Sequence, residues 1–378
     1  MHHWVCPIHK RKAVCAPSNY RGVHLTPQLS KVVERVLQSM WVPSLVRSGA
    51  FGENQFAYLP GRGTRDALAL AVLTWIKGFS HGQRFAVYCS DVSGAFDKVQ
   101  KIRLVGKLQA SGIDHSIRRV IESWLEDREA RVIVEGQHSK PMPLSNMVYQ
   151  GTVWGPPLWN LHYADARHAV RQSGFDELVF ADDLNAFKGF SKDVADEEIF
   201  NEMAVCQNNL HAWGRANQVE FDPGKESKHI LAMQGRGSGE CFKLLGVIFD
   251  VGLTMETALH DIAREASWRL ATILRTTRYF CTRELVGLYK SRILSYIESK
   301  TAAIYHACDT HLAHLDRVQQ RFLREIEVSE EEALIVYNLA PLSTRRDLAM
   351  LGLVHRTVLG VGPVQFEQFS VQPDIRLQ

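Results

Sequence analysis

Two adjacent aspartates, Asp182 and Asp183, interrupt the apolar run Val179–Leu184 and are the most chemically suggestive feature of this sequence. Like charges this close repel each other and apolar surroundings disfavour both, so a bound cation is expected to neutralise them. A third aspartate, Asp91, ends the apolar run that begins at Phe85. Ligand sets made only of oxygen favour Mg²⁺ or Mn²⁺. Three carboxylates at two strand ends therefore suit a two-metal site for in-line displacement at phosphorus.

Each of these features also has a purely structural interpretation. An Asp-Asp pair is common in turns and at helix caps, and Asp91 is a suitable N-cap for a helix that includes Ala95. Neither the pair nor Asp91 establishes a catalytic site by itself. The interpretation depends on which other motifs accompany them, and in which order.

The composition is that of an ordinary globular protein with ample material for a core: 378 residues, 46% hydrophobic and 22% charged. The 44 basic and 41 acidic residues leave a net charge of only +3, so any nucleic-acid site must be local. Seven cysteines without a Cys-x-x-Cys pair indicate a reducing compartment and free, buried thiols. The longest apolar run, Ala67–Ile76, is far shorter than the roughly 20 residues of a membrane span, and no signal peptide is recognisable. We therefore expect a soluble intracellular protein, nuclear or cytoplasmic.

The periodicity of apolar residues predicts the elements that position the aspartates. A helix that begins at Thr26-Pro27 is expected to pack an apolar stripe inward, formed by Leu29, Val32, Val33, Val36, Leu37 and Met40. Phe85–Asp91 reads as a buried strand, and Glu177–Phe187 as a hairpin with the aspartate pair at its tip.

The rest of the chain shows a shift from strands to helices. Asp114 is expected to cap a helix. Phe242–Asp250 reads as a further strand, in which Gly246 indicates a bulge or a close backbone approach. From about residue 257 the pattern is helical throughout, which predicts a domain boundary there.

In their order, these motifs resemble those of a reverse transcriptase of the non-LTR retrotransposon (LINE-like) kind. The resemblance extends from about Lys10 to Asp250, nearly two thirds of the chain. The matching stretches are the first fingers motif in Asn19–Leu25 with Glu34, the second in Gln55–Thr64, motif A in Asp91–Asp97, motif B in Gln150–Leu158, motif C in Phe180–Asp183, motif D around Lys225, and primer-grip motif E in Leu244–Asp250.

The resemblance implies a role for individual residues in these motifs. Asp91, Asp182 and Asp183 would bind two Mg²⁺ or Mn²⁺ ions, and Lys225 would protonate pyrophosphate. Phe96 would act as the steric gate that rejects a 2′-hydroxyl. The remaining implied contacts are the nucleotide pocket at Gln150 and Gly151, a phosphate grip by Arg21 with Lys10, Arg11 or Lys12, and the primer grip at Leu245 and Gly246.

The same resemblance implies an α+β right-hand polymerase fold with mixed fingers, an antiparallel-sheet palm packed on helices, and a helical thumb. The fingers would comprise residues 1–84 with a return segment near 115–145, the palm residues 85–255, and the thumb residues 256–378. One helix face of that thumb would hold the nucleic-acid backbone through Arg317, Arg321 and Arg324. Without the resemblance, the alternation of strands and helices equally suggests a parallel doubly wound sheet, and the arginines a solvated face.

The implied activity is that of an RNA-directed DNA polymerase, a nucleotidyltransferase that uses an RNA template, a DNA primer and dNTPs. Two alternatives stay open. One is a degenerate or domesticated copy that binds nucleic acid without catalysis, and the other is a metal-dependent nuclease built on the same carboxylates. Phe96 and Gln150 speak against the nuclease, because neither has an evident task in hydrolysis.

Four positions depart from the family pattern. Gly22 replaces a proline and Leu59 an arginine, changes expected to loosen closure of the fingers, while Trp154 and Pro157 alter motif B. No endonuclease-like, RNase H-like or zinc-knuckle segment is recognisable, and the chain begins almost on the first motif. We therefore expect a fragment or a decayed copy of a larger mobile-element polyprotein. The sequence does not specify the oligomeric state.

Overall fold

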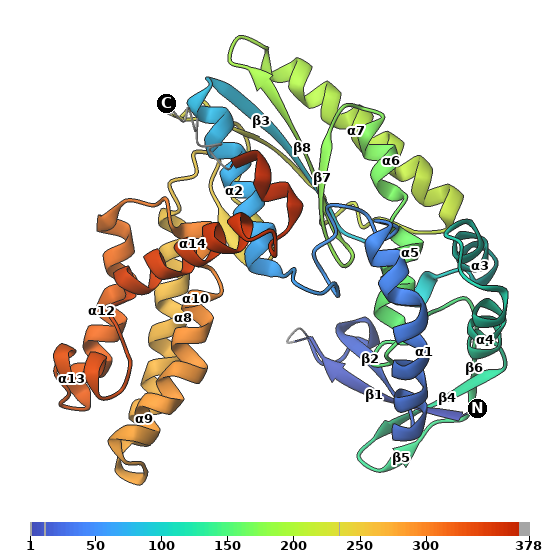
Figure 1. Cartoon of the computed structure of the whole chain (residues 1–378), viewed down its shortest axis with the longest axis horizontal. Coiled ribbons are helices and arrows are strands. Elements are labelled where there is room, and N and C mark those ends of the chain that lie inside the picture. Colours follow the sequence, from blue (N-terminus) through green and yellow to red (C-terminus); the bar gives the residue numbers. More distant parts are fainter. Residues whose placement is uncertain (1, 11–12, 234, 370–378) are drawn as a thin grey trace, which may run out of the picture. The chain divides into compact units, whose positions relative to one another are not determined.

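The computed structural model describes residues 2–10, 13–233 and 235–369 (Figure 1). Packing divides them into two compact units, and the chain passes between the units several times. As far as the chain is described, the first comprises Met1–Leu59, Tyr88–Lys188 and Asn201–Ser227, and the second Pro60–Val87, Gly189–Phe200 and Lys228–Gln378. These packing units differ from the three functional subdomains inferred from sequence, and the division into fingers, palm and thumb stays a prediction.

A five-stranded sheet in the first unit joins the N-terminus to a distant segment of the chain. Its strand order is β2-β1-β4-β5, and β6 also pairs with β4. β1 runs antiparallel to β2, with Ile8 opposite Arg21, and parallel to β4, with Trp4 opposite Arg131. Arg21 therefore has a fixed register on an outer strand of this sheet. The strands are β1 (His2–His9), β2 (Tyr20–Leu25), β4 (Arg128–Val134), β5 (Gln137–His138) and β6 (Met142–Leu144).

The aspartate pair lies in a second, four-stranded sheet with the order β7-β8-β3-β9. β7 and β8 are antiparallel and Phe180 pairs with Asp183, so Ala181 and Asp182 form a two-residue turn. This confirms the predicted hairpin, and the antiparallel pairing excludes a parallel doubly wound sheet. β3 is buried along almost its whole length, as its apolar sequence predicts. The strands are β3 (Gln83–Ser90), β7 (Asp176–Phe180), β8 (Asp183–Ser191) and β9 (Ser227–Leu231).

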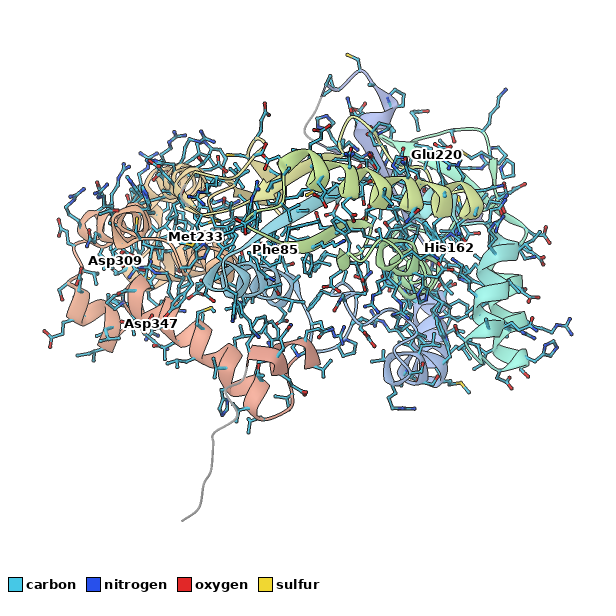
Figure 2. All side chains as sticks on the ribbon, turned by 90° about the horizontal axis from the view of Figure 1, so that it is seen from above. Phe85, His162, Glu220, Met233, Asp309 and Asp347 are labelled. Carbon is cyan, nitrogen blue, oxygen red and sulfur yellow. The ribbon has the colours of Figure 1, made fainter. Side chains whose placement is uncertain are left out.

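Among the helices of the first unit, α5 forms the centre of the core. Trp159, Asn160 and His162 on α5 have no exposed surface, and Figure 2 labels His162 within the packed side chains. The predicted cap of α4 is confirmed, since a carboxylate oxygen of Asp114 accepts a hydrogen bond from the backbone N–H of Ser116 at 2.8 Å. The helices are α1 (Gln28–Arg47), α3 (Lys101–Ala110), α4 (His115–Leu125), α5 (Gly155–Tyr163), α6 (Ala166–Arg171) and most of α7 (Asp196–Asn217).

The apolar stripe predicted for α1 does not pack inward, and this prediction was wrong. The buried side chains of the helix include Glu34 and Trp41 instead. Glu34 is held by hydrogen bonds and Trp41 buries a large aromatic surface, and neither effect is visible in the spacing of aliphatic residues. The helix also begins at Gln28, without a side-chain cap. The stripe residues that are between 48% and 75% exposed are Leu29, Val32, Val33, Val36 and Met40.

The second unit confirms the helical pattern predicted beyond about residue 257. By contrast, Phe242–Asp250 is not one bulged strand but a hairpin of β10 (Phe242–Leu244) and β11 (Val247–Phe249). Leu245 and Gly246 form its turn with φ of 47° and 83°, because paired left-handed residues match the twist of a tight hairpin. The helices are α2 (Thr64–Ser80), α8 (Glu256–Leu274), α9 (Thr282–Tyr289), α10 (Ser295–Glu298), α11 (Thr301–Ile304), α12 (Asp309–Glu325), α13 (Glu330–Ile335) and α14 (Leu342–Val358).

Two sequence-based expectations, the burial of the cysteines and the lack of a membrane span, can be compared with the structure. None of the described cysteines forms a disulfide, but only Cys89 and Cys206 are buried, so the expected burial holds for these two alone. In the part of the chain that the structure describes, no helix is both long and apolar enough to cross a bilayer.

Candidate active site

The tip of the β7-β8 hairpin places two carboxylates in partly buried surroundings. Burial raises the pKa of Asp182, and the charge of Asp91 raises it further, while Arg21 and Lys225 oppose the shift. Burial likewise raises the pKa of Asp183 to about 6, with added repulsion from Asp182 and Asp91. The three predicted aspartates therefore form one electrostatic unit, in which each additional negative charge is unfavourable.

Asp91, which follows β3, is paired with the predicted lysine. Its Oδ2 accepts a hydrogen bond from Lys225 Nζ at 2.6 Å, and the same ammonium lies 3.0 Å from Oδ2 of Asp222. The backbone N–H of Asp222 also donates to the carbonyl of Asp91 at 2.9 Å, which fixes the two segments to each other. The hydrogen bonds from Lys225 to Asp91 and Asp222 raise the pKa of the ammonium. Lys225 is therefore charged at neutral pH.

The chemistry of this donor set suits a hard divalent cation, because it offers only carboxylate oxygens whose mutual repulsion a cation relieves. Within the described ranges, however, no three or more His, Cys, Asp or Glu side chains are arranged to hold a metal ion. At Asp91 the Lys225 ammonium supplies the positive charge. Lys225 would therefore compete with a cation for Oδ2 of Asp91.

Phe96 is held beside this site by packing. It lies in a short 3₁₀ helix, Ala95–Lys98, and its ring stacks on Trp159 with centroids 5.8 Å apart and an interplanar angle of 22°. Its exposed fraction is only 8%. A Cβ on Gly155 would lie 2.6 Å from the carbonyl oxygen of Tyr149 and 3.5 Å from the Phe96 ring. A glycine is therefore required at 155, and Phe96 has little freedom to move.

The predicted nucleotide-pocket residues pack directly against β2. The backbone N–H of His24 donates to the carbonyl of Gln150 at 2.7 Å. Gly151 has a φ of 95°, and a Cβ there would lie only 2.8 Å from the carbonyl oxygen of His24. The loop is thereby fixed to the strand that presents Arg21. The charge of Arg21 opposes the rise in the pKa of Asp182. Lys12 and Arg11 lie outside the described residues.

Sequence reasoning placed Glu34 in a motif but missed its function in the fold. This buried carboxylate accepts hydrogen bonds from Trp124 Nε1 at 3.2 Å, and from the backbone N–H groups of Val153 and Trp154 at 2.8 and 3.2 Å. The indole of Trp154 in turn donates to the carbonyl of Glu34 at 2.7 Å. The unusual tryptophan of motif B therefore closes a network between α1 and the 151–155 loop. The sequence signal that could have revealed this role is a glutamate within a helix that packs against the core.

The predicted primer-grip and backbone-binding residues belong to the second unit. Leu245 and Gly246 occupy the turn of the β10-β11 hairpin. Arg317, Arg321 and Arg324 are exposed along one face of α12, opposite the buried Leu315 and Phe322. The predicted arginine stripe thus exists as a solvent-facing cationic surface.

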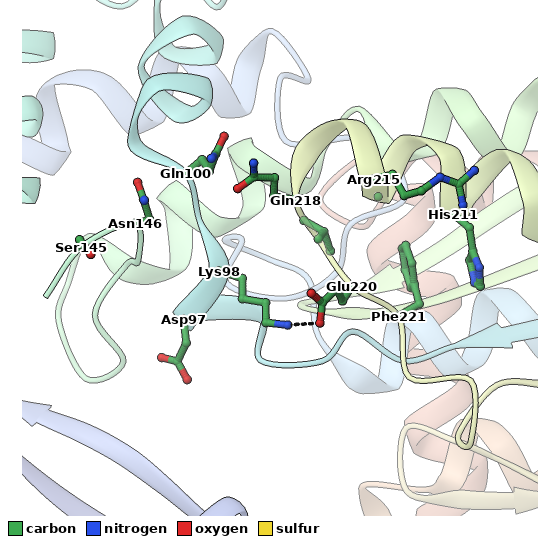
Figure 3. A pocket seen from close by; sticks show the side chains of 12 residues that line it. Asp97, Lys98, Gln100, Ser145, Asn146, His211, Arg215, Gln218, Glu220 and Phe221 are labelled. Carbon is green, nitrogen blue, oxygen red and sulfur yellow. Dashed lines mark hydrogen bonds and ion pairs between the residues drawn. The ribbon is translucent and has the colours of Figure 1, made fainter.

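The first unit also contains a polar cavity of about 580 Å³. Figure 3 shows the amides of Gln100, Asn146 and Gln218 around it, and an ion pair between Lys98 and Glu220 in its wall. None of the three aspartates at the hairpin and β3 lines it. The candidate active site is therefore distinguished by its clustered charges and not by the size of a cavity.

This fold, with an acidic β-hairpin facing the carboxylate at the end of a buried strand, defines a right-hand polymerase of the α+β class. The chain belongs to the family described as "Reverse transcriptase (RNA-dependent DNA polymerase)", whose profile matches residues 8–249. It is 24% identical over 325 residues to the "RNA-directed DNA polymerase from mobile element jockey" of Drosophila funebris, covering 82% of this chain and 35% of that protein. It is 23% identical over 341 residues to the "Probable RNA-directed DNA polymerase from transposon X-element" of Drosophila melanogaster, covering 84% and 37%.

The sequence-based expectation of a LINE-like reverse transcriptase domain is confirmed by these similarities. The chain spans little more than a third of the length of these relatives. Among solved structures, it is similar to telomerase from Candida albicans in complex with a fragment of telomeric RNA, with a TM-score of 0.52 and 11% identity over 89% of this chain and 64% of that one. At this identity the likeness supports the right-hand fold alone.

Proposed function

We propose that this chain is the polymerase part of a retrotransposon-like element and extends a DNA primer along an RNA template. The observation that supports this most is the meeting of Asp91, Asp182, Asp183 and Lys225 at one site. Such an arrangement of carboxylates and one ammonium suits transfer of a nucleotidyl group.

In this proposal the three aspartates hold two Mg²⁺ or Mn²⁺ ions. Bound ions would lower the pKa of the primer 3′-hydroxyl and neutralise the leaving pyrophosphate. Asp91 and Asp182 would hold them, and Asp183 would complete the acidic cluster. Lys225, being protonated at neutral pH, would give up its contact with Asp91 and supply a proton to pyrophosphate.

The neighbouring residues bind the nucleotide. Phe96, fixed against Trp159, occupies the volume that a 2′-hydroxyl would need. Gln150 and Gly151 line the pocket, and Arg21 grips the triphosphate together with one basic residue of the 10–12 segment. The charge of Arg21 acts on Asp182, which supports a role for Arg21 between the acidic site and a bound phosphate.

The second unit binds the template-primer duplex. Arg317, Arg321 and Arg324 contact phosphates, which makes binding weaken as salt increases. The turn at Leu245 and Gly246 supports the primer end. The protein acts in the nucleus or cytoplasm, with RNA, DNA and dNTPs as its partners.

Extension of a DNA primer on an RNA template, with Mg²⁺ and dNTPs, tests this proposal. The wild type is expected to extend the primer, and Asp91→Asn is expected to bind template-primer with similar affinity but not to extend it. Cleavage of nucleic acid without nucleotides would instead support the nuclease. Binding without extension by the wild type would support the decayed copy.

A further inference from the structure

Two buried side chains hold the turn that presents Asp182. Gln55 Oε1 accepts a hydrogen bond from the backbone N–H of Ala181 at 3.0 Å, and Gln55 Nε2 donates to the Ala181 carbonyl at 3.3 Å. Trp159 Nε1 donates to the same carbonyl at 3.1 Å. Gln55 is 3% exposed and Trp159 is fully buried. Both backbone groups of Ala181 are therefore bound by side chains from distant parts of the sequence.

Gln55 is itself fixed in place by its own segment. The backbone N–H of Phe56 donates to the Val179 carbonyl at 2.9 Å, and that of Val179 donates to the Asn54 carbonyl at 3.0 Å. Gln55 and Val179 thus form a parallel bridge beside β7. The backbone N–H of Ala57 also donates to Gln55 Oε1 at 2.9 Å, so the amide has one orientation. The segment acts as a rigid support along the edge of the hairpin.

The turn needs such support for two reasons. Ala181 has a φ of 60°, a left-handed conformation that is unfavourable for a non-glycine residue. Asp182 and Asp183 are also adjacent carboxylates, and like charges this close repel each other. Both effects favour a different turn, which would change the directions of the two carboxylates relative to Asp91.

We propose that Gln55 is a positioning residue that holds Ala181 so that Asp182 and Asp183 stand ready to bind divalent cations, and that Trp159 assists it. This inference rests on the proposed function. Trp159 also stacks on Phe96, so one side chain supports both the acidic turn and the residue assigned to sugar selection. In this inference Gln55 acts through its hydrogen bonds to the backbone of Ala181 and not on nucleotide or metal directly.

The test compares Mn²⁺ affinity, measured by electron paramagnetic resonance on the full chain without nucleic acid, in the wild type and Gln55→Met. Methionine keeps the volume of the side chain but removes all three hydrogen bonds. Loss of such supporting contacts typically weakens metal affinity 10–100-fold, so about 10-fold or more is expected. Amide hydrogen exchange at Ala181 should become faster in the same variant.

Asn160→Leu is the matched control. Asn160 is fully buried and its Nδ2 donates to the Ala57 carbonyl at 2.9 Å, so this variant loses a buried amide contact to the same segment without touching Ala181. A loss of stability with unchanged Mn²⁺ affinity is expected. If Gln55→Met does not fold, Trp159→Phe, which removes the indole donor together with part of the ring, should weaken Mn²⁺ binding in the same direction.

Two results would overturn the inference. One is equal Mn²⁺ affinity in the wild type and in Gln55→Met, or in Trp159→Phe if that variant is used. The other is a wild type that binds no Mn²⁺. Since the measurement needs no primer extension, failure of the polymerase assay with Mn²⁺ binding intact would reject the proposed function separately.

Discussion

Lys225 donates a hydrogen bond to Asp91, so under the proposed function its removal should act in opposite directions on metal binding and on catalysis. In Lys225→Met, the competing ammonium is gone, and Mn²⁺ affinity in the absence of nucleotide should rise a few-fold. The rate of nucleotide incorporation should fall about 100-fold or more, because a positioned general acid is lost. Electron paramagnetic resonance and single-turnover incorporation measure the two effects.

Lys98→Met provides the control for this prediction. Lys98 is also a half-buried lysine with a carboxylate partner, Glu220, but it lies in the wall of the polar cavity. Both Mn²⁺ affinity and incorporation should stay close to those of the wild type. A Lys225→Met enzyme that keeps its incorporation rate would contradict the role of Lys225 as proton donor.

Phe96 allows a second prediction at the level of one side chain. Phe96→Val removes the ring that the proposed function places at the sugar, so incorporation of rNTPs relative to dNTPs should rise about 10-fold or more, measured as the ratio of kcat/KM values. The same change opens a cavity in the core beside Trp159. Phe175→Val, at a residue that is 1% exposed in the same unit, should lower stability without changing sugar selection. An unchanged ratio of kcat/KM for rNTPs and dNTPs in Phe96→Val would contradict the role of Phe96 as steric gate.

At the scale of elements, the network around Glu34 fixes α1 to the 151–155 loop. Glu34→Gln keeps the shape of the side chain but directs an NH₂ group or a weaker acceptor at two backbone N–H donors. Because buried donors without acceptors are costly, the free energy of unfolding in urea should fall by about 1–3 kcal/mol. Arg35→Gln removes an exposed charge from the same helix and should change it little. Equal effects in both variants would contradict this account of the loop.

Local sequence patterns predicted those elements whose structure is determined by residues close together in the sequence. The β7-β8 hairpin follows from two apolar runs around a polar pair, and the α4 cap from Asp114. The buried face of α1 and the side chains that hold Ala181 depend on hydrogen bonds between distant segments. The periodicity of apolar residues does not reveal such bonds. The prediction for Phe242–Asp250 was wrong for another reason. Gly246 suggests a bulge in the sequence, whereas Gly246 and Leu245 together form a left-handed turn.

At the scale of the whole molecule, buried histidines predict loss of stability in mild acid. Burial among α5 neighbours lowers the pKa of His162 to about 3, with Lys107 and Arg103 adding to the shift. Since the unfolded chain has a histidine pKa near 6.5, it binds the extra proton between these values, and stability falls as pH drops below about 6.5. At pH 5 this one residue costs about 2 kcal/mol.

Unfolding of His162→Leu and of the wild type at several pH values checks the direction of this pH dependence. The free energy of unfolding should depend less steeply on pH between 7 and 5 in the variant, although its value at pH 7 also changes. His115→Gln, at an exposed residue that begins α4, should leave the slope unaltered. A wild-type slope in His162→Leu would show that His162 is protonated in the folded chain.

The central claim is that the two carboxylates at the hairpin tip and Asp91 form a polymerase site. Its most direct measurement is extension of a DNA primer on an RNA template with Mg²⁺ and dNTPs by the wild type and by the double variant Asp182→Asn/Asp183→Asn, with template-primer binding measured in parallel. The account predicts extension by the wild type only, with binding retained in both. Extension by the double variant, or none by a wild type that binds template-primer, would contradict it.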